Sequence, residues 1–394
     1  MNHPAYGARQ PRRRTRRTAG LALCVAAITA VVACTPPPAA DWTAVGGSVT
    51  SSGTPPIAVT QVNASGDPVV ATVSGSTLSV STWTGSSWAK LGAKLNTGTS
   101  PWVMQGGMAL DATGSPIVAW TDGGSGYVAR WSGSAWQAVG APVANVFDED
   151  LYIASATPLT IGYLRSTGVP PAGRQLIVAS WTGSAWTTLA PRVLPNYTVG
   201  YPLSVTLDES GNPIVAWQGL RATGGSGDWD LVVERYSGGA WSQLGGVLNV
   251  NPLWGASGAE VQAAAGTITV SWIETAFRQP FLTYVKQWTG TGWQQLGGAV
   301  GQTIGSPYAT LVVDGFGRPI VASQVNNTDL AVQTWDGSGW VAVGGIPNPV
   351  ADGTPLGPFS LGRSGSTLAL SWIGPPGSGY AVYVSRLVMS SGQA

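Results

Sequence analysis

Residues that could carry out chemistry are few in this chain, and their types restrict what that chemistry could be. Only 9% of the 394 residues are charged, the one histidine is His3, and the two cysteines are Cys24 and Cys34. Beyond position 34 the chain therefore has neither histidine nor cysteine. This excludes Ser-His-Asp and Cys-His nucleophile systems, a histidine base, zinc held by His or Cys, and disulfide bonds. Catalysis in this part would depend on carboxylates, tyrosines, lysines or arginines.

The charged residues gather in the middle of the chain. Three expected long loops, 164–175, 218–230 and 273–282, carry arginines and carboxylates, and the acidic run 148–150 precedes the first of them. Such side chains can form charge-assisted hydrogen bonds with a polar ligand. The candidate ligand-binding residues in these segments are Asp148, Asp150, Arg165, Arg174, Arg221, Asp228, Asp230, Glu274 and Arg278.

Carboxylate pairs in these segments raise the alternative of glycoside hydrolysis, which uses two carboxyl groups about 5 to 10 Å apart. Asp228 with Asp230, or Asp148 with Asp150, could be that close, but neither pair has apolar neighbours in sequence that would raise one pKa. The same oxygens would suit Ca²⁺. We therefore favour binding over catalysis, name no catalytic residue, and expect no cofactor except Ca²⁺ as an open alternative.

Most tryptophans belong to a repeated segment, W-x-G-x-x-W-x-x-[LV]-G, that returns through nearly the whole chain. Its second tryptophans, counting a half copy at 42–46, are 46 to 55 residues apart. A period near 50 residues, built only from strand and turn signals, is typical of propeller blades. The copies lie at 83–92, 131–140, 288–297 and 335–344, and with one change at 181–190 and 236–245.

Each period also contains an apolar run, a turn and a second apolar run, which gives four short strands in all. The turn is D-x-x-G-x-P at 111–116, 208–213 and 314–319, with an asparagine variant at 63–68. Aspartate or asparagine at its first position suits a bond from the side chain to the backbone. The repeated tryptophans should pack between neighbouring sheets and contribute to the core.

The strand sets number seven, and the last, at about 358–389, lacks a fourth strand. Residues 41–49 fit the pattern of that missing strand. We therefore expect an all-β fold, a single seven-bladed β-propeller of four-stranded antiparallel blades, with the last blade closed by the N-terminal strand. Closure of this kind removes exposed sheet edges.

The two repeated segments resemble the Trp-Gly-rich propeller repeats of many bacterial exported proteins and lipoproteins. The resemblance covers about residues 41–389 and implies the fold, but no single activity is attached to such repeats. The chain lacks the S-x-D-x-G-x-T-W boxes of sialidases and the W-D blade ends of WD40 proteins, so neither function is implied.

The N-terminal segment predicts export. Six arginines precede position 20 and are followed by the apolar run 21–33, which is the order of a signal peptide and too short for a spanning helix. The run ends in V-V-A-C, which resembles a lipobox and implies lipidation of Cys34. We thus expect a lipoprotein signal peptide at 1–33, a lipidated cysteine and Pro-rich tether at 34–40, and the propeller at 41–394.

These features predict a lipid anchor in the cell envelope. The residue after the cysteine, Thr35, is not the aspartate of inner-membrane retention, which favours the outer membrane or cell surface. The Arg16-Arg17 pair leaves export by the general or the twin-arginine route open. Removing residues 1–33 leaves 13 Lys and Arg against 18 Asp and Glu, and this acidic balance excludes a nucleic-acid partner.

Three tryptophans depart from the repeat and are the informative aromatic residues. Trp102 and Trp254 lie in connections between strand sets, and Trp229 lies inside the loop 218–230. Topology places all three on the face opposite the tether, together with the charged loops. We therefore expect a monomeric, exported recognition domain that binds carbohydrate or another envelope polymer. A scaffold for envelope proteins is the alternative, and a carboxylate-dependent hydrolase is less favoured.

Overall fold

The computed structural model describes residues 41–166, 174–189, 192–193, 199–220, 229–303, 308–325, 329–345, 347, 358–374 and 379–389. Contacts divide the chain into two units, Met1–Pro38 and Ala39–Ala394, and the described residues all belong to the second. The expected signal peptide, Cys34 and the tether lie outside the described residues. Within the described ranges no helix is long and apolar enough to cross a membrane.

All regular elements of the described residues are β-strands. The first three sheets of the chain contain β3 (Ile57–Val62), β4 (Pro68–Ser74), β5 (Thr77–Trp83) and β6 (Trp88–Lys90); β7 (Pro101–Trp102), β8 (Met108–Leu110), β9 (Pro116–Asp122), β10 (Ser125–Trp131), β11 (Trp136–Ala138) and β12 (Val143–Ala144); and β13 (Val146–Ala156), β14 (Leu159–Ser166), β15 (Arg174–Trp181), β16 (Trp186–Thr188) and β17 (Arg192–Val193).

The remaining sheets follow the same plan. They contain β18 (Val199–Leu207), β19 (Pro213–Leu220), β20 (Trp229–Ser237) and β21 (Ala240–Gln243); β22 (Gly255–Ala264), β23 (Thr267–Thr275), β24 (Phe281–Trp288), β25 (Trp293–Gln295), β26 (Gly301–Thr303), β27 (Ala309–Val313), β28 (Pro319–Val325), β29 (Asp329–Trp335) and β30 (Trp340–Ala342); and β31 (Ser360–Ser364), β32 (Thr367–Gly374) and β33 (Tyr380–Val388) with β1 (Thr43–Ala44) and β2 (Thr50–Ser52).

The repeating unit is a four-stranded antiparallel meander. It is seen in the orders β3-β4-β5-β6 and β18-β19-β20-β21, and the nine-stranded sheet holds two such meanders linked through β26. In the last sheet β1 takes the fourth position by pairing with β33, with Thr43 opposite Arg386. The chain is therefore an all-β fold of repeated sheets, in a propeller-like arrangement.

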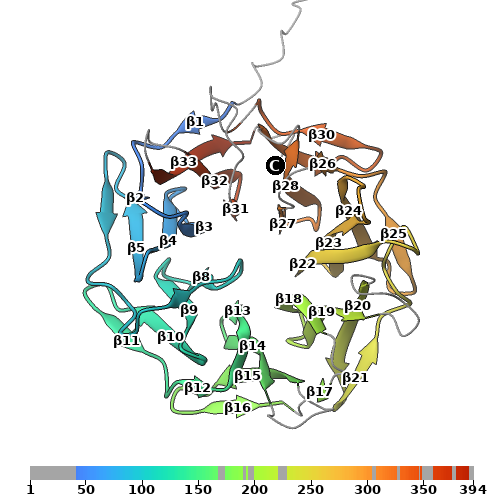
Figure 1. The fold of residues 1–394 in the computed structure, drawn as a ribbon, viewed down its shortest axis with the longest axis horizontal. Coiled ribbons are helices and arrows are strands. Elements are labelled where there is room, and N and C mark those ends of the chain that lie inside the picture. Colours follow the sequence, from blue (N-terminus) through green and yellow to red (C-terminus); the bar gives the residue numbers. More distant parts are fainter. Residues whose placement is uncertain are drawn as a thin grey trace, which may run out of the picture. The chain divides into compact units, whose positions relative to one another are not determined.

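The first strand of each meander lies nearest a common centre, as Figure 1 shows. These inner strands touch one another in chain order, from β3 through β8, β13, β18, β22 and β27 to β31, and β31 in turn contacts β3. Their side chains therefore surround a central channel. Any site in that channel combines residues that are far apart in sequence.

The second strands are buried on both faces because a sheet lies on either side of them. All seven residues of β9, P-I-V-A-W-T-D, are buried, as are six of the seven in β4. Such strands read as continuous apolar runs instead of alternating patterns. This arrangement explains why polar residues within them, such as Asp122 and Glu274, need partners inside the protein.

The repeated tryptophans join each sheet to the preceding one. The indole Nε1 of Trp136 donates to the carbonyl of Leu91 at 2.6 Å. The glycine that ends the preceding repeat, Gly92, has φ +69°, and a Cβ there would lie 2.9 Å from the ring of Trp131. Only glycine combines this backbone conformation with so close an approach. The structural role expected for these tryptophans is thus confirmed.

The same bond recurs between other neighbouring meanders. It links Trp293 to Leu244, Trp340 to Leu296, Trp42 to Val343 and Trp88 to Val45, with nitrogen-to-oxygen distances of 2.6, 2.8, 2.9 and 3.1 Å.

The D-x-x-G-x-P segments form side-chain-to-backbone turns, as expected. Asp111 Oδ1 accepts hydrogen bonds from the backbone nitrogens of Thr113 and Ser115 at 2.9 and 3.0 Å. Equivalent pairs of bonds are made by Asn63, Asp208 and Asp314. These bonds hold the turns between the first and second strands.

Candidate functional site

The central channel contains two cavities that follow one another along the inner strands. Along β3, β27 and β31, the residues at and just before the beginning of each strand line one cavity, and the later residues line the other. Gln105, Tyr152, Ser204 and Glu260 belong to both linings. We call these four residues the waist.

The first cavity, the aromatic pocket, has a volume of about 280 Å³. It opens on the side where connections arrive from the preceding sheets. This is the side on which the sequence predicts ligand binding. Its walls are mainly apolar, and its polar groups are those of the waist. The aromatic pocket is lined by Ile57, Ala58, Trp102, Val103, Met104, Gly258, Ala259, Ile273, Tyr308, Ala309, Pro358 and Phe359, with the waist.

Two aromatic side chains of this pocket are partly open to solvent. Trp102 is 40% exposed and Tyr308 is 36% exposed. The indole of Trp102 donates to Met104 Sδ at 2.9 Å, and the ring of Tyr308 lies edge-on to Phe359 with 6.3 Å between centroids. Both rings are therefore held in place by neighbours while part of each surface stays accessible.

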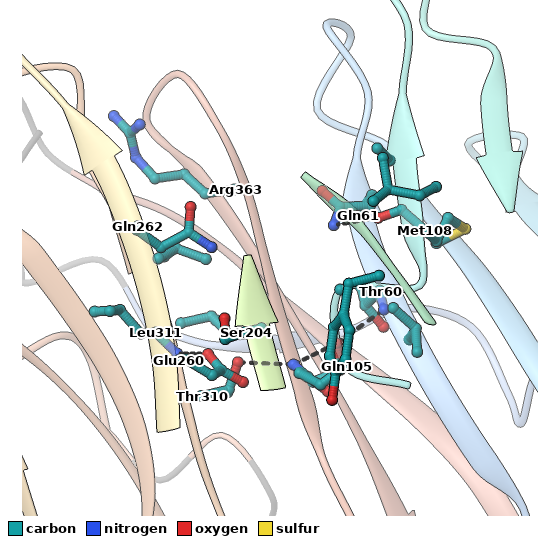
Figure 2. Close-up of a pocket in the computed structure, with 18 of the residues that line it drawn as sticks. Thr60, Gln61, Gln105, Met108, Ser204, Glu260, Gln262, Thr310, Leu311 and Arg363 are labelled. Atoms are coloured by element: carbon teal, nitrogen blue, oxygen red, sulfur yellow. Dashed lines mark hydrogen bonds between the residues drawn. The ribbon is translucent and has the colours of Figure 1, made fainter. Parts of the chain in front are cut away.

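The second cavity, the polar cavity, has a volume of about 290 Å³ and is shown in Figure 2. It is lined by Val59, Thr60, Gln61, Gly106, Met108, Ala109, Ile153, Ala154, Ser155, Val205, Gln262, Thr310, Leu311, Val312, Val313, Ser360, Leu361 and Arg363, with the waist.

Hydrogen bonds across the channel hold the waist together. The amide Nε2 of Gln105, which lies just before β8, donates to Thr310 Oγ1 at 2.8 Å and to Ser360 Oγ at 3.1 Å, in β27 and β31 (Figure 2). Glu260 Oε2 accepts from the backbone nitrogen of Leu311 at 2.5 Å. The side chain of Gln105 thus bridges two other inner strands at the level where the aromatic pocket and the polar cavity meet.

The acids of the waist are held in their neutral forms. Desolvation raises the pKa of Glu260 to about 8, although hydrogen bonds from Leu311 and Thr310 oppose the shift. Burial and the charge of nearby Asp150 raise the pKa of Tyr152 well above its usual value, and the Tyr152 hydroxyl donates to Asp150 Oδ1 at 3.2 Å. At neutral pH the carboxyl group of Glu260 can therefore donate a proton in a hydrogen bond to a ligand, whereas the Tyr152 proton is already donated to Asp150.

Of the residues proposed from sequence, Trp102 is the one that lines the aromatic pocket. Asp150 is buried and reaches the waist only through Tyr152. The backbone carbonyls of Trp229 and Trp254 both accept from Asn249 Nδ2 at 2.9 Å, so the backbones of these two residues lie close together beside the connection into β22. They do not line either cavity.

Glu274, proposed as a ligand-binding residue, is completely buried and holds a loop in place. Its carboxylate accepts bonds from the backbone nitrogens of Val250 and Asn251 at 2.5 and 2.9 Å, from Asn251 Nδ2 at 3.0 Å, and from Trp272 Nε1 at 2.8 Å. Asp122 has a similar place on β9 and accepts from Ser100 N at 3.2 Å. No face of Glu274 is open to a ligand, so the prediction that Glu274 contacts a ligand directly is wrong.

The other proposed residues that the structure describes line neither cavity. Arg165 donates to Gln175 Oε1 at 2.6 Å across β14 and β15, where Arg174 also lies. Arg278 is exposed beside the ring of Phe277, 5.0 Å from its centroid. Asp230 is the second residue of β20 and is partnered. Arg221, Asp228 and the side chain of Asp148 lie outside the described residues, so these predictions stay untested.

Sequence reasoning missed Gln105 and Glu260. The available signal was a carboxylate inside an otherwise apolar inner strand, A-E-V-Q at 259–262. In the described part of the chain, no three acidic, histidine or cysteine side chains are grouped as a metal site would require.

Comparisons with known proteins identify the fold but no family. No protein-family description matches the chain, and no curated protein matches it in sequence. Among solved structures, the polysaccharide lyase PL25 ulvan lyase, bound to -[GlcA(1-4)Rha3S]-, is similar with a TM-score of 0.58 and 12% identity, covering 88% of this chain and 96% of that one. At this identity the likeness shows the fold alone.

Weaker likenesses are found to other proteins of glycan recognition and processing. A lectin of Aleuria aurantia, in complex with Fucalpha1-6GlcNAc, has a TM-score of 0.48 and 15% identity, covering 76% of this chain and 97% of that one. The α-L-arabinanase of Penicillium chrysogenum has a TM-score of 0.43 and 15% identity, with 71% and 91% coverage. These two likenesses are too distant to support an argument.

Proposed function

We propose that the aromatic pocket binds a carbohydrate. The observation that carries this proposal is the pairing of two fixed, partly exposed rings, Trp102 and Tyr308, with a polar floor formed by the waist. A sugar ring has an apolar C–H face and hydroxyl groups at its edge. Aromatic walls with a few placed polar groups are the usual composition of a pocket for such an amphipathic ligand.

The floor supplies hydrogen bonds of both kinds. Gln105 lines the pocket and donates two bonds through Nε2, and its side-chain carbonyl oxygen can act as an acceptor. Neutral Glu260 can donate to a sugar hydroxyl. A carbohydrate bound between the rings would thus find both an acceptor and a donor at the base of the pocket.

The cellular setting of the protein is part of the same proposal. Export, cleavage before Cys34, lipidation of that cysteine and attachment to the outer membrane or cell surface are supported by the six arginines, the apolar run 21–33 and the V-V-A-C sequence. A monomer anchored in this way could use the aromatic pocket to bind an envelope or extracellular polymer. Ca²⁺ dependence remains open and is included in the binding test.

For the fold we further propose seven blades in a closed ring. The two meanders β22–β25 and β27–β30 then count as separate blades, although β26 links them. The pairing of β1 with β33 and the contact between β31 and β3 support closure through a blade shared by the two ends of the domain.

Replacing Trp102 with alanine should abolish or strongly weaken carbohydrate binding. The test is binding of the purified protein to a broad glycan panel with and without Ca²⁺, followed by titration of a glycan that binds. Because an aromatic contact is worth about 0.5 to 1.5 kcal/mol beyond the apolar area that it buries, and the loss of that buried area adds to this, the variant should lose roughly tenfold in affinity.

Phe316→Ala is the matched control for this variant. Phe316 is an aromatic residue that is 75% exposed on a D-x-x-G-x-P turn, outside both cavities. The Phe316→Ala variant should bind the glycan as the wild type does. Failure of the wild type to bind any glycan would refute the carbohydrate proposal, and recovery of an envelope protein in a pull-down would then favour the scaffold alternative.

A further inference from the structure

The polar cavity contains hydroxyl groups whose protons are not used in the hydrogen bonds that these groups make. Three serine hydroxyls in its lining act as acceptors in the bonds that they make. Ser155 Oγ accepts from Thr157 N at 3.1 Å, Ser204 Oγ accepts from Val261 N at 3.0 Å, and Ser360 Oγ accepts from Thr60 N at 2.9 Å. Each hydroxyl proton therefore remains available to another acceptor.

Arg363 adds a positive charge to this cavity. Its Nη1 donates to the carbonyl of Val313 at 3.3 Å, and its Nε is buried without a hydrogen-bond partner. No carboxylate in the described part of the chain lies within ion-pair distance of this guanidinium. Burial lowers the pKa of Arg363, as expected for a cation that lacks close compensation.

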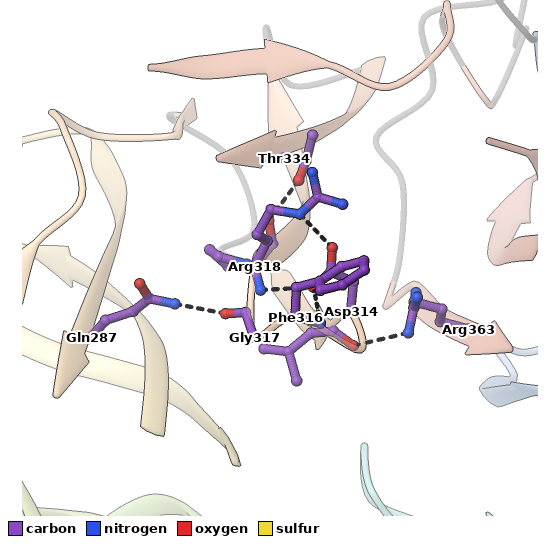
Figure 3. A network of polar contacts seen from close by, with 9 residues as sticks. Gln287, Asp314, Phe316, Gly317, Arg318, Thr334 and Arg363 are labelled. Atoms are coloured by element: carbon purple, nitrogen blue, oxygen red, sulfur yellow. Dashed lines mark hydrogen bonds and ion pairs between the residues drawn. The ribbon is translucent and has the colours of Figure 1, made fainter. Parts of the chain in front are cut away.

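The nearest acid is already committed to other groups. Asp314 Oδ2 accepts from Arg318 Nε at 2.6 Å, and Asp314 Oδ1 accepts from the backbone nitrogens of Phe316 and Arg318 at 2.8 Å each. Figure 3 shows this network, with Arg363 bonded to the backbone carbonyl beside it. Asp314 lowers the free-energy cost of burying the positive charge of Arg363. Most of the N–H groups of Arg363 are still left without an acceptor among the described residues.

The titratable side chains of the lining do not supply a negative charge at neutral pH. Glu260 and Tyr152 are both neutral there because their pKa values are raised. Asp150 is bonded to Tyr152 and is not part of the lining. The polar cavity therefore combines one cation, uncommitted hydroxyl protons and the amide of Gln262, which are the donors that an oxyanion requires.

We propose that the polar cavity is a second binding site, selective for a small oxyanion group such as sulfate, phosphate or a carboxylate. The anion would lie against the guanidinium of Arg363 and accept bonds from the serine hydroxyls and from Gln262. Because Arg363 and Gln262 line the polar cavity and not the aromatic pocket, this site is distinct from the proposed carbohydrate site. The anion could be a free ion or the acidic group of a saccharide.

Titration of the wild-type protein with sodium sulfate by calorimetry at pH 7, against sodium chloride at matched ionic strength, tests the site. We expect saturable sulfate binding that Arg363→Gln weakens at least tenfold and Arg363→Lys restores in part. Arg130→Gln is the matched control, because the Arg130 side chain is 41% exposed and pairs with Asp111 outside the cavity. It should bind sulfate as the wild type does.

Two further arms make the outcome decisive. Gln262→Ala, which retains the positive charge of Arg363, should weaken sulfate binding several-fold. This variant replaces Arg363→Gln as the test if Arg363→Gln does not fold. A 6-sulfated monosaccharide compared with its unsulfated parent distinguishes a saccharide group from a free ion. Absence of saturable binding, or equal affinity in the wild type and a folded Arg363→Gln protein, would overturn the proposal. Trp102→Ala should leave sulfate affinity unchanged, which separates this site from the aromatic pocket.

Discussion

Replacing Glu274 with alanine should lower the free energy of unfolding by about 3 to 5 kcal/mol, because it removes the shared acceptor of several buried donors. The carboxylate is 0% exposed and binds the backbone nitrogens of Val250 and Asn251 together with Trp272 Nε1. Without it these donors lose their partners in the interior, and the connection into β22 loses its anchor. Urea unfolding followed by circular dichroism measures the change.

Glu209→Ala provides the matched control for this experiment. Glu209 is exposed and accepts a single bond, from Gly266 N at 2.8 Å, so its loss should cost no more than about 1 kcal/mol. If Glu274→Ala proved as stable as the control, the structural role given to Glu274 would be wrong. A ligand-binding role would then have to be considered again.

Replacing Glu260 with glutamine should make the protein more stable above neutral pH. The pKa of Glu260 is about 8 in the folded protein, whereas its ordinary value is 4.5. Between pH 4.5 and about pH 8 the unfolded chain therefore releases a proton that the folded chain retains. Stability from this group is therefore highest below about pH 4.5 and falls as the pH rises to about 8. The loss is on the order of 3 kcal/mol, allowing for partial exposure of the side chain.

Glutamine keeps the shape and the acceptor for Leu311 N but does not ionise. We expect the difference in unfolding free energy between Glu260→Gln and wild type to grow between pH 5 and pH 8 and then to level off. Glu209→Gln, on the surface, should give no such growing difference. A constant difference for Glu260→Gln across this range would contradict the raised pKa.

The fold could be predicted from sequence because its causes are local and repeated. Each terminal glycine, such as Gly92, is needed where a tryptophan of the next repeat packs, and each turn aspartate, such as Asp111, binds its own backbone. Because of these requirements, the same residue types recur at the same spacing in each repeat. The N-terminal strand could be assigned to the last sheet because it completes that spacing.

The candidate site was only partly predictable because it is assembled from different repeats. Trp102 was found because it departs from the repeat. Glu260 was missed because its strand ends in A-A-G instead of the aspartate turn, which conceals the register of the strand. Because charged residues are scarce in this chain, Glu274 was interpreted as a ligand-binding residue. Its position two residues after Trp272, on a strand that is buried on both faces, instead indicates an internal anchor.

The most direct test of the central claim compares Trp102→Ala with Trp229→Ala in titrations of the same panel-selected glycan. Trp102 lines the aromatic pocket, whereas Trp229 lies beside the connection into β22 and outside both cavities. Recognition in the channel predicts that Trp102→Ala loses at least tenfold in affinity while Trp229→Ala stays within about twofold of wild type. Loss of binding in Trp229→Ala with unchanged affinity in Trp102→Ala would contradict it and place the ligand on the loops instead.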